Sequence, residues 1–359
     1  MSRHLVVDLS AHGFGHVAQT APVVNALARR LPDLKITLRS AAPADLLASR
    51  FSCGFTHLTE TLDFGMVMGG ALAVKAADSA AAYRALHGSW DRQVAAATER
   101  LAALAPDAVL ANVPYLSLAA AARARIPAVA LCSLNWADIF FPYCREMPDA
   151  GRIQRHMLDA YNSARVFLRV EPAMPMTSLT NARAIGPVAR LGVNRREAIN
   201  ARLGLPPERR LILAAMGGIP FRPPVECWPR LPGITWLAPA AWASAHPDMA
   251  PLESLAMPFT DLLASCDALL TKPGYGSFAE AACNGVPVLT VRRADWPEEP
   301  YLVAWLRTAG CCREITLAQL EAGDLAGPLA ALPTQRPAPV APRGVVQAVD
   351  YLAALLASS

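Results

Sequence analysis

The sequence has few charged side chains and no long uninterrupted apolar run. Only 17% of its 359 residues are Asp, Glu, Lys or Arg, whereas 53% are hydrophobic. A disordered chain needs the opposite balance, so the composition predicts folded domains. Spanning a bilayer takes about 18 or more consecutive apolar residues. The richest stretch, residues 116–132, is interrupted by Arg123, Arg125 and Pro127, so we expect no transmembrane helix.

The sequence also lacks the marks of secretion, of a structural metal site and of nucleic-acid binding. Residues 1–8 have neither the basic nor the long apolar segment of a signal peptide, so we expect a cytoplasmic protein. The eight cysteines form no CxxC pair, which favours buried, reduced thiols over metal ligands. No basic cluster is interleaved with aromatic residues, so nucleic acid is not an expected partner. The net charge of +4 leaves open a weak peripheral contact with anionic lipids, because local charge clusters matter more than net charge.

Apolar segments of strand length alternate with longer helical segments along the chain. The first series predicts strands at 5–9, 35–39, 107–111 and 128–132, and helices at 17–31, 76–104 and 115–124. The second series predicts strands at 211–216, 235–237, 268–271 and 286–291, and helices at 278–283 and 301–308. This rhythm is typical of parallel, doubly wound sheets in an α/β protein.

The length of the chain predicts two domains, because a typical domain has about 100–200 residues. Glycine and proline interrupt residues 183–207, which indicates an interdomain connection in that region. We expect one domain at 1–185 and a second at 186–342. Residues 333–342 hold four prolines and are typical of an extended linker. Residues 344–356 predict a terminal helix, within a last segment at 343–359.

Two glycines and two histidines follow the first predicted strand. His12, Gly13, Gly15 and His16 lie just before the first predicted helix. Glycines at such a turn allow a ligand to approach the backbone, and doubly wound sheets bind ligands at the carboxyl ends of strands. Neutral imidazole is a suitable base near pH 7. The alternative is that both histidines only cap or pack the turn. The strand-loop-helix context favours a functional role for His16 and leaves His12 undecided. Zinc binding is the weaker interpretation, because no third ligand is evident.

A second glycine-containing loop, residues 272–277, follows the predicted strand 268–271. The N-terminus of the helix after it favours phosphate, and Lys272 adds a full positive charge. Ser277 is a candidate helix cap or phosphate donor. Glu280 lies one turn further on, placed to accept hydrogen bonds from vicinal hydroxyls such as those of a ribose. The alternative is an ordinary turn with a solvated Lys272 and an exposed Glu280.

Two further segments support a site in the second half of the chain. The turn at 216–220 contains Gly217 and Gly218, directly after another predicted strand. The segment 292–301 concentrates charge at a strand end, with Arg293, Glu298 and Glu299, as a polar sugar site would need. The alternative interpretation of this segment is a solvated, charged loop.

Taken together, these segments resemble the GT-B glycosyltransferases, including the group that adds N-acetylglucosamine to the peptidoglycan lipid carrier. The likeness is greatest to the N-terminal, glycosyltransferase-like half of plant L-arabinokinase and its bacterial relatives, and it runs over essentially the whole chain. The matching stretches are 12–16, 135–136, 217–218, 272–276, 280–281, 286–287, 291–293 and 298–301. The run from 272 to 301 is the most specific of them.

This resemblance implies two Rossmann-like domains that face a central cleft, with the acceptor on domain 1–185 and a nucleotide-sugar donor on domain 186–342. The segment 343–359 would pack back on the first domain. Gly274, Gly276 and Ser277 would approach the diphosphate, Glu280 the ribose, and Glu298 and Glu299 the donor sugar. His16 matches the general base of inverting enzymes, which generally need no metal. The remaining substrate-binding candidates are His12, Gly13, Gly15, Trp136, Gly217, Gly218, Lys272, Tyr275 and Arg293.

The chain departs from this pattern at the partner of the base. Many relatives orient the histidine with an acidic residue, and Asn112 stands at the matching position, after the strand 107–111. An amide orients an imidazole but does not stabilise the imidazolium as a carboxylate does. Asp138, just past Trp136, is the alternative partner, although it is one place removed from the acid expected in arabinokinase-like chains. The sugar-kinase half of arabinokinase has no counterpart here, so we infer no kinase activity.

The leading functional prediction is an inverting, metal-independent glycosyltransferase that uses a nucleotide-sugar as co-substrate and no cofactor. A nucleotide-sugar epimerase of the same fold is the first alternative, and it would need no acceptor. A non-catalytic protein that binds a nucleotide-sugar and regulates a partner is the second. The base, the sugar and the acceptor are not encoded in any motif, because those pockets lie in variable loops.

Overall fold

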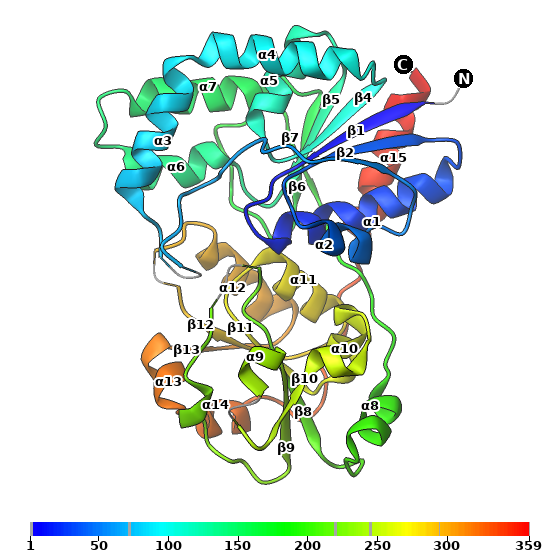
Figure 1. Cartoon of the computed structure of the whole chain (residues 1–359), viewed down its shortest axis with the longest axis vertical. Helices are drawn as coiled ribbons and strands as arrows, with labels where there is room; N and C mark the ends of the chain where they lie inside the picture. The colour runs from blue at the N-terminus through cyan, green and yellow to red at the C-terminus, as the bar shows by residue number, and fades with distance from the viewer. Residues whose placement is uncertain (1–2, 71–72, 219–220, 244–245, 294, 359) are drawn as a thin grey trace. The chain divides into compact units, whose positions relative to one another are not determined.

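A computed structural model describes residues 3–70, 73–218, 221–243, 246–293 and 295–358 (Figure 1). The chain divides into two compact units. Unit 1 comprises Met1–Val188 and Arg343–Ser359, and unit 2 comprises Ala189–Pro342. The boundaries expected from the sequence, after residues 185 and 342, lie within three residues of these. Three residues of the predicted turns, Ile219, Pro220 and Ala294, lie outside the described residues.

Unit 1 is built on a parallel sheet, with the order β3-β2-β1-β4-β5-β6-β7 among the described residues. Its strands are β1 (His4–Leu9), β2 (Lys35–Arg39), β3 (Thr56–Leu58), β4 (Ala108–Asn112), β5 (Ala128–Cys132), β6 (Val166–Val170) and β7 (Ala182–Ile185). Every residue of β1, β4 and β5 is buried. A parallel sheet is covered by helices on both faces, which is why its strands are apolar along their whole length.

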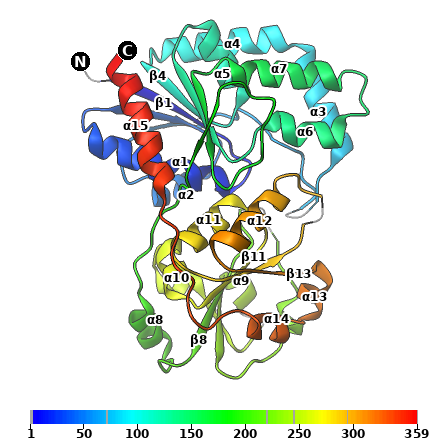
Figure 2. The same cartoon turned by 180° about the vertical axis from the view of Figure 1, so that it is seen from behind.

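The helices of unit 1 form a layer on each face of this sheet (Figures 1 and 2). On one face, α1 (Phe14–Arg30) lies beside α15 (Arg343–Ser358). On the other face, α5 (Tyr115–Arg123) packs between α4 (Trp90–Ala103) and α7 (Ala150–Asn162). The remaining helices are α2 (Ala44–Arg50), α3 (Ala76–Gly88) and α6 (Trp136–Cys144). The terminal helix α15 is also hydrogen-bonded to the residue that follows β7. Gly186 N donates to Gln347 Oε1 at 2.7 Å.

Unit 2 is built on a second parallel sheet, with the order β10-β9-β8-β11-β12-β13 among the described residues. Its strands are β8 (Arg210–Ala214), β9 (Ile234–Ala238), β10 (Met249–Pro251), β11 (Ala268–Thr271), β12 (Val288–Val291) and β13 (Cys312–Ile315). Its helices are α8 (Arg196–Leu203), α9 (Ala240–Ala243), α10 (Phe259–Ser265), α11 (Tyr275–Cys283), α12 (Glu299–Ala309), α13 (Leu317–Ala322) and α14 (Ala326–Ala330), with short 3₁₀ turns at Val225–Cys227 and Leu252–Leu255. Trp228, Trp236 and Trp242 lie in its core.

Strand order reverses once in each sheet, and these reversals position the candidate sites. In unit 1 the reversal lies between β1 and β4, and in unit 2 between β8 and β11. At such a switch point the helices that follow the two strands leave on opposite faces, which opens a crevice at the carboxyl ends. The segments after β1, β4, β8 and β11 therefore lie where a doubly wound sheet binds its ligand.

Two helices begin earlier than the sequence predicts. Helix α1 begins at Phe14 rather than residue 17, and α11 begins at Tyr275 rather than residue 278. The first-turn N–H groups of a helix need no intrahelical partner, so glycines are tolerated there. His16 and Ser277 consequently lie in first turns rather than in loops. The prediction that Ser277 caps α11 is wrong, because Gly274 occupies the cap position.

None of the eight cysteines, all of which are described, forms a disulfide. Cys227 is exposed, so the prediction of buried thiols is wrong for that residue. Four others are buried, namely Cys132, Cys144, Cys266 and Cys283. Within the described ranges, no helix combines the length and the apolar character needed to cross a membrane.

Candidate functional site

The structure joins His16 to Asn112 at the switch point of unit 1. His16 lies in the first turn of α1, and Asn112 is the last residue of β4, where it pairs with Leu9 of β1. Because β4 pairs directly with β1, Asn112 at the end of β4 lies next to the turn that follows β1. The His16 Nδ1 atom lies 2.8 Å from Asn112 Oδ1, and both side chains are buried.

The neighbours of Asn112 fix the direction of this hydrogen bond. Its Nδ2 group donates to Thr20 Oγ1 at 3.0 Å, and the Thr20 hydroxyl donates in turn to the His16 carbonyl at 2.8 Å. With Nδ2 engaged in this way, the Asn112 oxygen faces the imidazole and accepts from Nδ1–H. A neutral imidazole that donates through Nδ1 carries its lone pair on Nε2. The arrangement prepares Nε2 of His16 to accept a proton.

Burial decides the charge state of His16. It lowers the pKa of His16 to about 4, and the hydrogen bond to Asn112 opposes this effect only in part. The imidazole is therefore neutral at pH 7 and able to accept a proton. The imidazolium that would form is poorly stabilised, since the amide of Asn112 carries no negative charge.

Replacing Asn112 by aspartate is expected to raise the pKa of His16. An adjacent carboxylate favours the imidazolium and shifts such a pKa by about one to three units. The acidic limb of the pH profile of kcat/KM should move upward by the same amount, because the base must be deprotonated in the free enzyme. The measurement is a pH–rate profile, or a histidine NMR titration if no substrate is known. Asn112→Ala is the control, since it removes the oriented oxygen without adding charge and should not move the limb upward.

Asp138 is not the alternative partner of His16, which corrects that prediction. It lies in the first turn of α6, where Asn135 is the N-cap and accepts from Asp138 N at 2.8 Å. The Asp138 carboxylate accepts from Asn135 Nδ2 at 2.9 Å. Burial raises the pKa of Asp138, and the bond from Asn135 opposes that shift. Asp138 therefore stabilises the start of α6 rather than the imidazole.

The space around the glycines before His16 is empty of protein atoms, whereas the Trp136 side chain is buried. A side chain at Gly13 or Gly15 would meet no atom within 4 Å, and Gly13 has φ +98°, which favours glycine. Trp136 is fully buried. Its ring centroid lies 5.1 Å from that of His12 and 5.8 Å from that of His16. In the structure the Trp136 ring packs on the two histidines, and its contact with a substrate stays a prediction.

The loop of Lys272 lies against the glycine turn after β8 in unit 2. Strands β8 and β11 are neighbours, with Ala214 opposite Leu270. A Cβ atom at Gly217, where φ is +76°, would lie 3.5 Å from Lys272 Cε. Burial, together with the charge of Arg293, lowers the pKa of Lys272 to about 8, while Glu298 opposes this shift. The two predicted glycine segments thus lie side by side, with the half-buried Lys272 between them.

In the charged segment after β12, Arg293, Glu298 and Glu299 are buried, so the interpretation as a solvated loop is wrong for these three residues. Arg292 and Asp295 of the same segment are exposed. The Arg293 guanidinium lies 4.1 Å from the centroid of the Trp296 ring, and Trp296 Nε1 donates to Glu298 at 3.2 Å. Both carboxylate oxygens of Glu299 accept from Arg293 N at 2.9 Å. Burial raises the pKa of Glu299 to about 7, with a further contribution from Glu314. Glu299 therefore holds the backbone of the segment that carries Arg293 and Glu298.

The first turn of α11 follows Lys272 in the sequence and starts from an open cap. A side chain at Gly274 would meet no atom within 4 Å. Tyr275 and Gly276, the next two residues, are buried in the helix, and Gly218 is half-buried beside Gly217. Glu280 is only 2% exposed, so the alternative in which it is a solvated surface residue is wrong. Its contact with a ribose stays a prediction.

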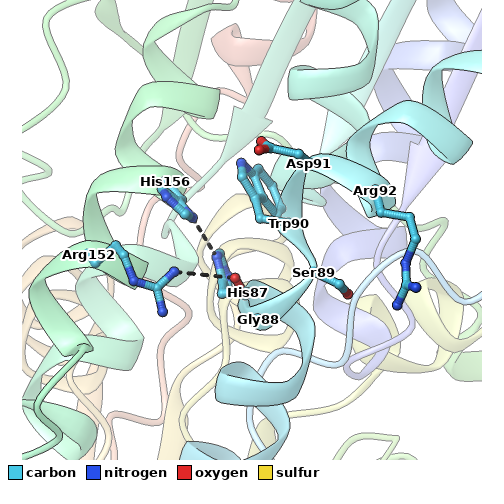
Figure 3. Close-up of a pocket in the computed structure, with 8 residues that line it drawn as sticks. All are labelled: His87, Gly88, Ser89, Trp90, Asp91, Arg92, Arg152 and His156. Atoms are coloured by element: carbon cyan, nitrogen blue, oxygen red, sulfur yellow. Dashed lines mark hydrogen bonds between the residues drawn. The ribbon is translucent and has the colours of Figure 1, made fainter.

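A pocket of about 290 Å³ lies between α3, α4 and α7, and no sequence motif indicated it. Figure 3 shows His87 and His156 facing each other across it, with Nδ1 atoms 3.2 Å apart. His87 is also stacked on Trp90 at 4.9 Å. Burial, together with the charges of His156 and Arg152, lowers the pKa of His87 to about 3, while Asp149 opposes this shift. Two imidazoles do not complete a metal site, and the described part of the chain has no group of three or more metal-ligating side chains.

Comparisons with known proteins identify the fold. No family model matches the sequence. L-arabinokinase of Arabidopsis thaliana is 26% identical over 344 residues, which cover 90% of this chain and 32% of that protein. The chain thus spans about a third of the length of this relative. A calicheamicin glycosyltransferase has a TM-score of 0.63 at 19% identity, with 99% of both chains covered. The fold is that of the GT-B glycosyltransferases.

Other GT-B structures show that this fold serves more than one reaction. The glycosyltransferase VinC in complex with dTDP has a TM-score of 0.55 at 14% identity, covering 99% of this chain and 95% of its own. A putative UDP-N-acetylglucosamine 2-epimerase from Listeria monocytogenes has a TM-score of 0.59 at 15% identity, covering 100% and 94%. At these identities the likeness establishes the GT-B fold, and the reaction has to be argued from the site.

Proposed function

We propose that the chain is an inverting, metal-independent glycosyltransferase that moves a sugar from a nucleotide-sugar donor to an acceptor hydroxyl. The observation that carries this proposal is the oriented His16, whose Nδ1–H donates to Asn112 and whose Nε2 is prepared to accept a proton. It lies at a strand carboxyl end beside open glycines, where a GT-B protein would receive its acceptor. A cytoplasmic location is part of the same proposal.

In this reaction, His16 Nε2 removes the proton of the acceptor hydroxyl as its oxygen attacks the anomeric carbon. The bond between that carbon and the donor phosphate breaks, and the nucleoside diphosphate leaves with the electron pair. A single displacement of this kind inverts the anomeric configuration. The imidazolium then has to return its proton to solvent, which a pKa of about 4 makes rapid.

The departing diphosphate needs positive charge, and unit 2 offers it without a metal ion. The first turn of α11 follows Gly274 with the partial positive charge of a helix N-terminus. Lys272, immediately before it, stands against Gly217. Stabilising charge that develops on a leaving group is commonly the largest electrostatic contribution to catalysis. VinC, with the same fold, binds dTDP, which supports a nucleoside diphosphate as the group released here.

An epimerase is the second candidate, because one of the structures with this fold is a putative UDP-N-acetylglucosamine 2-epimerase. An epimerase would isomerise a nucleotide-sugar without an acceptor and without net release of nucleoside diphosphate.

The experiment that tests the proposal mixes the purified chain with a panel of nucleotide-sugars, with and without an acceptor extract. Release of nucleoside diphosphate that depends on the extract is the expected result. Conversion of a nucleotide-sugar to its epimer in buffer alone would support the second candidate. Tight binding of nucleotide with no turnover in any mixture would contradict both and favour a regulatory protein.

A further inference from the structure

Asp63 connects two elements that are far apart in the sequence. It lies between β3 and α3, in a segment without regular secondary structure. Its Oδ1 atom accepts from Ser10 Oγ at 2.7 Å, and its Oδ2 atom accepts from Trp136 Nε1 at 2.7 Å. Ser10 directly follows β1 and Trp136 begins α6. One carboxylate therefore joins the turn that carries His12 to the helix start that packs on both histidines.

Phe64 and Gly65, the two residues after Asp63, both contact the His12 ring. The carbonyl of Phe64 lies 3.2 Å from His12 Nδ1. Because a carbonyl only accepts, Nδ1 donates and the lone pair of the neutral imidazole is on Nε2. Gly65 has φ +60°, and a Cβ atom there would lie 2.8 Å from His12 Cγ and 2.6 Å from Trp136 Cη2. Only glycine fits this position, so the segment is in close contact with both rings.

Both partners of Asp63 lead on to the candidate base. Ser10 N donates to the Asn112 carbonyl at 2.8 Å, and Ser10 Oγ accepts from His12 N at 3.2 Å. The fully buried Trp136 ring contacts His12 edge-on and His16 at a tilt. A shift of the Asp63 carboxylate is therefore transmitted to His12 and to the His16–Asn112 pair by two separate routes.

We propose that Asp63 is a positioning residue that fixes His12 and His16 relative to each other through Ser10 and Trp136, so that both imidazoles present Nε2 to one acceptor. This inference rests on the proposed function, which it deepens: the acceptor hydroxyl is deprotonated by His16 while His12 hydrogen-bonds to a second polar group of the same acceptor. A polyhydroxylated acceptor, with two oxygens in reach of two imidazoles, is the class that fits.

The charge state of Asp63 matters for this role. Only the ionised carboxylate accepts from both donors, since a protonated carboxyl or an amide presents a donor to one of them. Burial raises the pKa of Asp63 to about 6, and the bonds from Ser10 and Trp136 oppose that shift. The titratable groups around it are His12, His16 and the tyrosines Tyr83, Tyr115 and Tyr161. Burial raises the pKa of the three tyrosines and lowers that of His16, so these four side chains stay neutral at pH 7. The carboxylate is ionised above about pH 6 and protonated below it.

The test is Asp63→Asn in the full chain, read by NMR with ¹⁵N-tryptophan and ¹³C-histidine labels. In the unaltered protein the Trp136 indole N–H signal, assigned with Trp136→Phe, should titrate with a midpoint near pH 6. In Asp63→Asn this titration should be lost, and the ring signals of His12 and His16 should shift. The ring signals of His246, in unit 2, should not shift. Asp78→Asn is the matched control, because Asp78 is an exposed carboxylate on α3 paired with Lys75.

The readouts separate this proposal from the proposed function. Unchanged His12 and His16 signals in Asp63→Asn would overturn the positioning role, whatever the activity. Shifted signals in a protein that has no turnover would support positioning and contradict glycosyl transfer. Once substrates are known, Asp63→Asn should lower kcat about tenfold, since small misplacements of catalytic groups are costly, and leave the KM of the donor unchanged. If Asp63→Asn does not fold, Ser10→Ala removes one of the two bonds, and the same histidine shifts are expected.

Discussion

Replacing His16 by alanine is expected to lower kcat by about 10²–10⁴-fold, the range that a positioned acid–base group contributes. The Nε2 atom of His16 is the proton acceptor that the Asn112 hydrogen bond prepares. Nucleotide affinity should stay almost intact, because the candidate diphosphate site at Lys272 and α11 belongs to unit 2. The measurements are steady-state kinetics at saturating donor and calorimetry with a nucleoside diphosphate.

Two other histidines of unit 1 serve as controls. His12→Ala should have a smaller effect on kcat, because His12 is proposed to orient the acceptor rather than take its proton. His57→Ala should have almost none, since His57 hydrogen-bonds to the Ser40 carbonyl at 3.0 Å and touches neither His16 nor Asn112 through any hydrogen bond in the structure. Near-normal turnover in His16→Ala would place the base elsewhere and remove the main support for the proposed mechanism.

Local sequence patterns predicted the central strands of both sheets but missed β3, β6, β7, β10 and β13. Strand β5 and strand β11 were predicted with their observed bounds, because a buried parallel strand is a short apolar run between turn residues. The place of Asn112 next to His16 was implied by the resemblance to GT-B enzymes. The structure gives its physical basis: Asn112 ends β4, His16 lies just after β1, and these two paired strands end at one edge of the sheet.

The residues that the sequence did not reveal depend on contacts between distant segments. Asp63 and Gly65 lie in a stretch with no regular element, and nothing near them in the sequence marks the Trp136 ring as their partner. The burial of three charged residues was missed for a different reason. Glu298, Glu299 and Arg293 form a charged run that a local reading assigns to solvent or to a sugar, yet their partners Trp296 and the backbone of the same loop bury them.

Replacing Gly274 by valine is expected to weaken nucleotide binding by about 100-fold or more, or about 2.8 kcal/mol, without unfolding the protein. Gly274 is the N-cap of α11 and has φ −175° and ψ 140°, an extended conformation that valine adopts readily. A Cβ atom there would meet no protein atom within 4 Å. The new side chain therefore disturbs nothing in the free protein. It fills the space through which a phosphate would reach the N–H groups of the first turn.

The matched control is Gly327→Val in α14, because a side chain at Gly327 also meets no atom within 4 Å but lies at no predicted ligand site. Both variants should keep the melting temperature of the unaltered protein, and calorimetry with UDP or dTDP should show a loss of affinity in Gly274→Val alone. Since neither substitution contacts protein atoms, a selective loss reports ligand contact at α11 rather than altered packing. Equal affinity in Gly274→Val and Gly327→Val would show that the diphosphate does not bind at the N-terminus of α11, and Lys272 would then need another role.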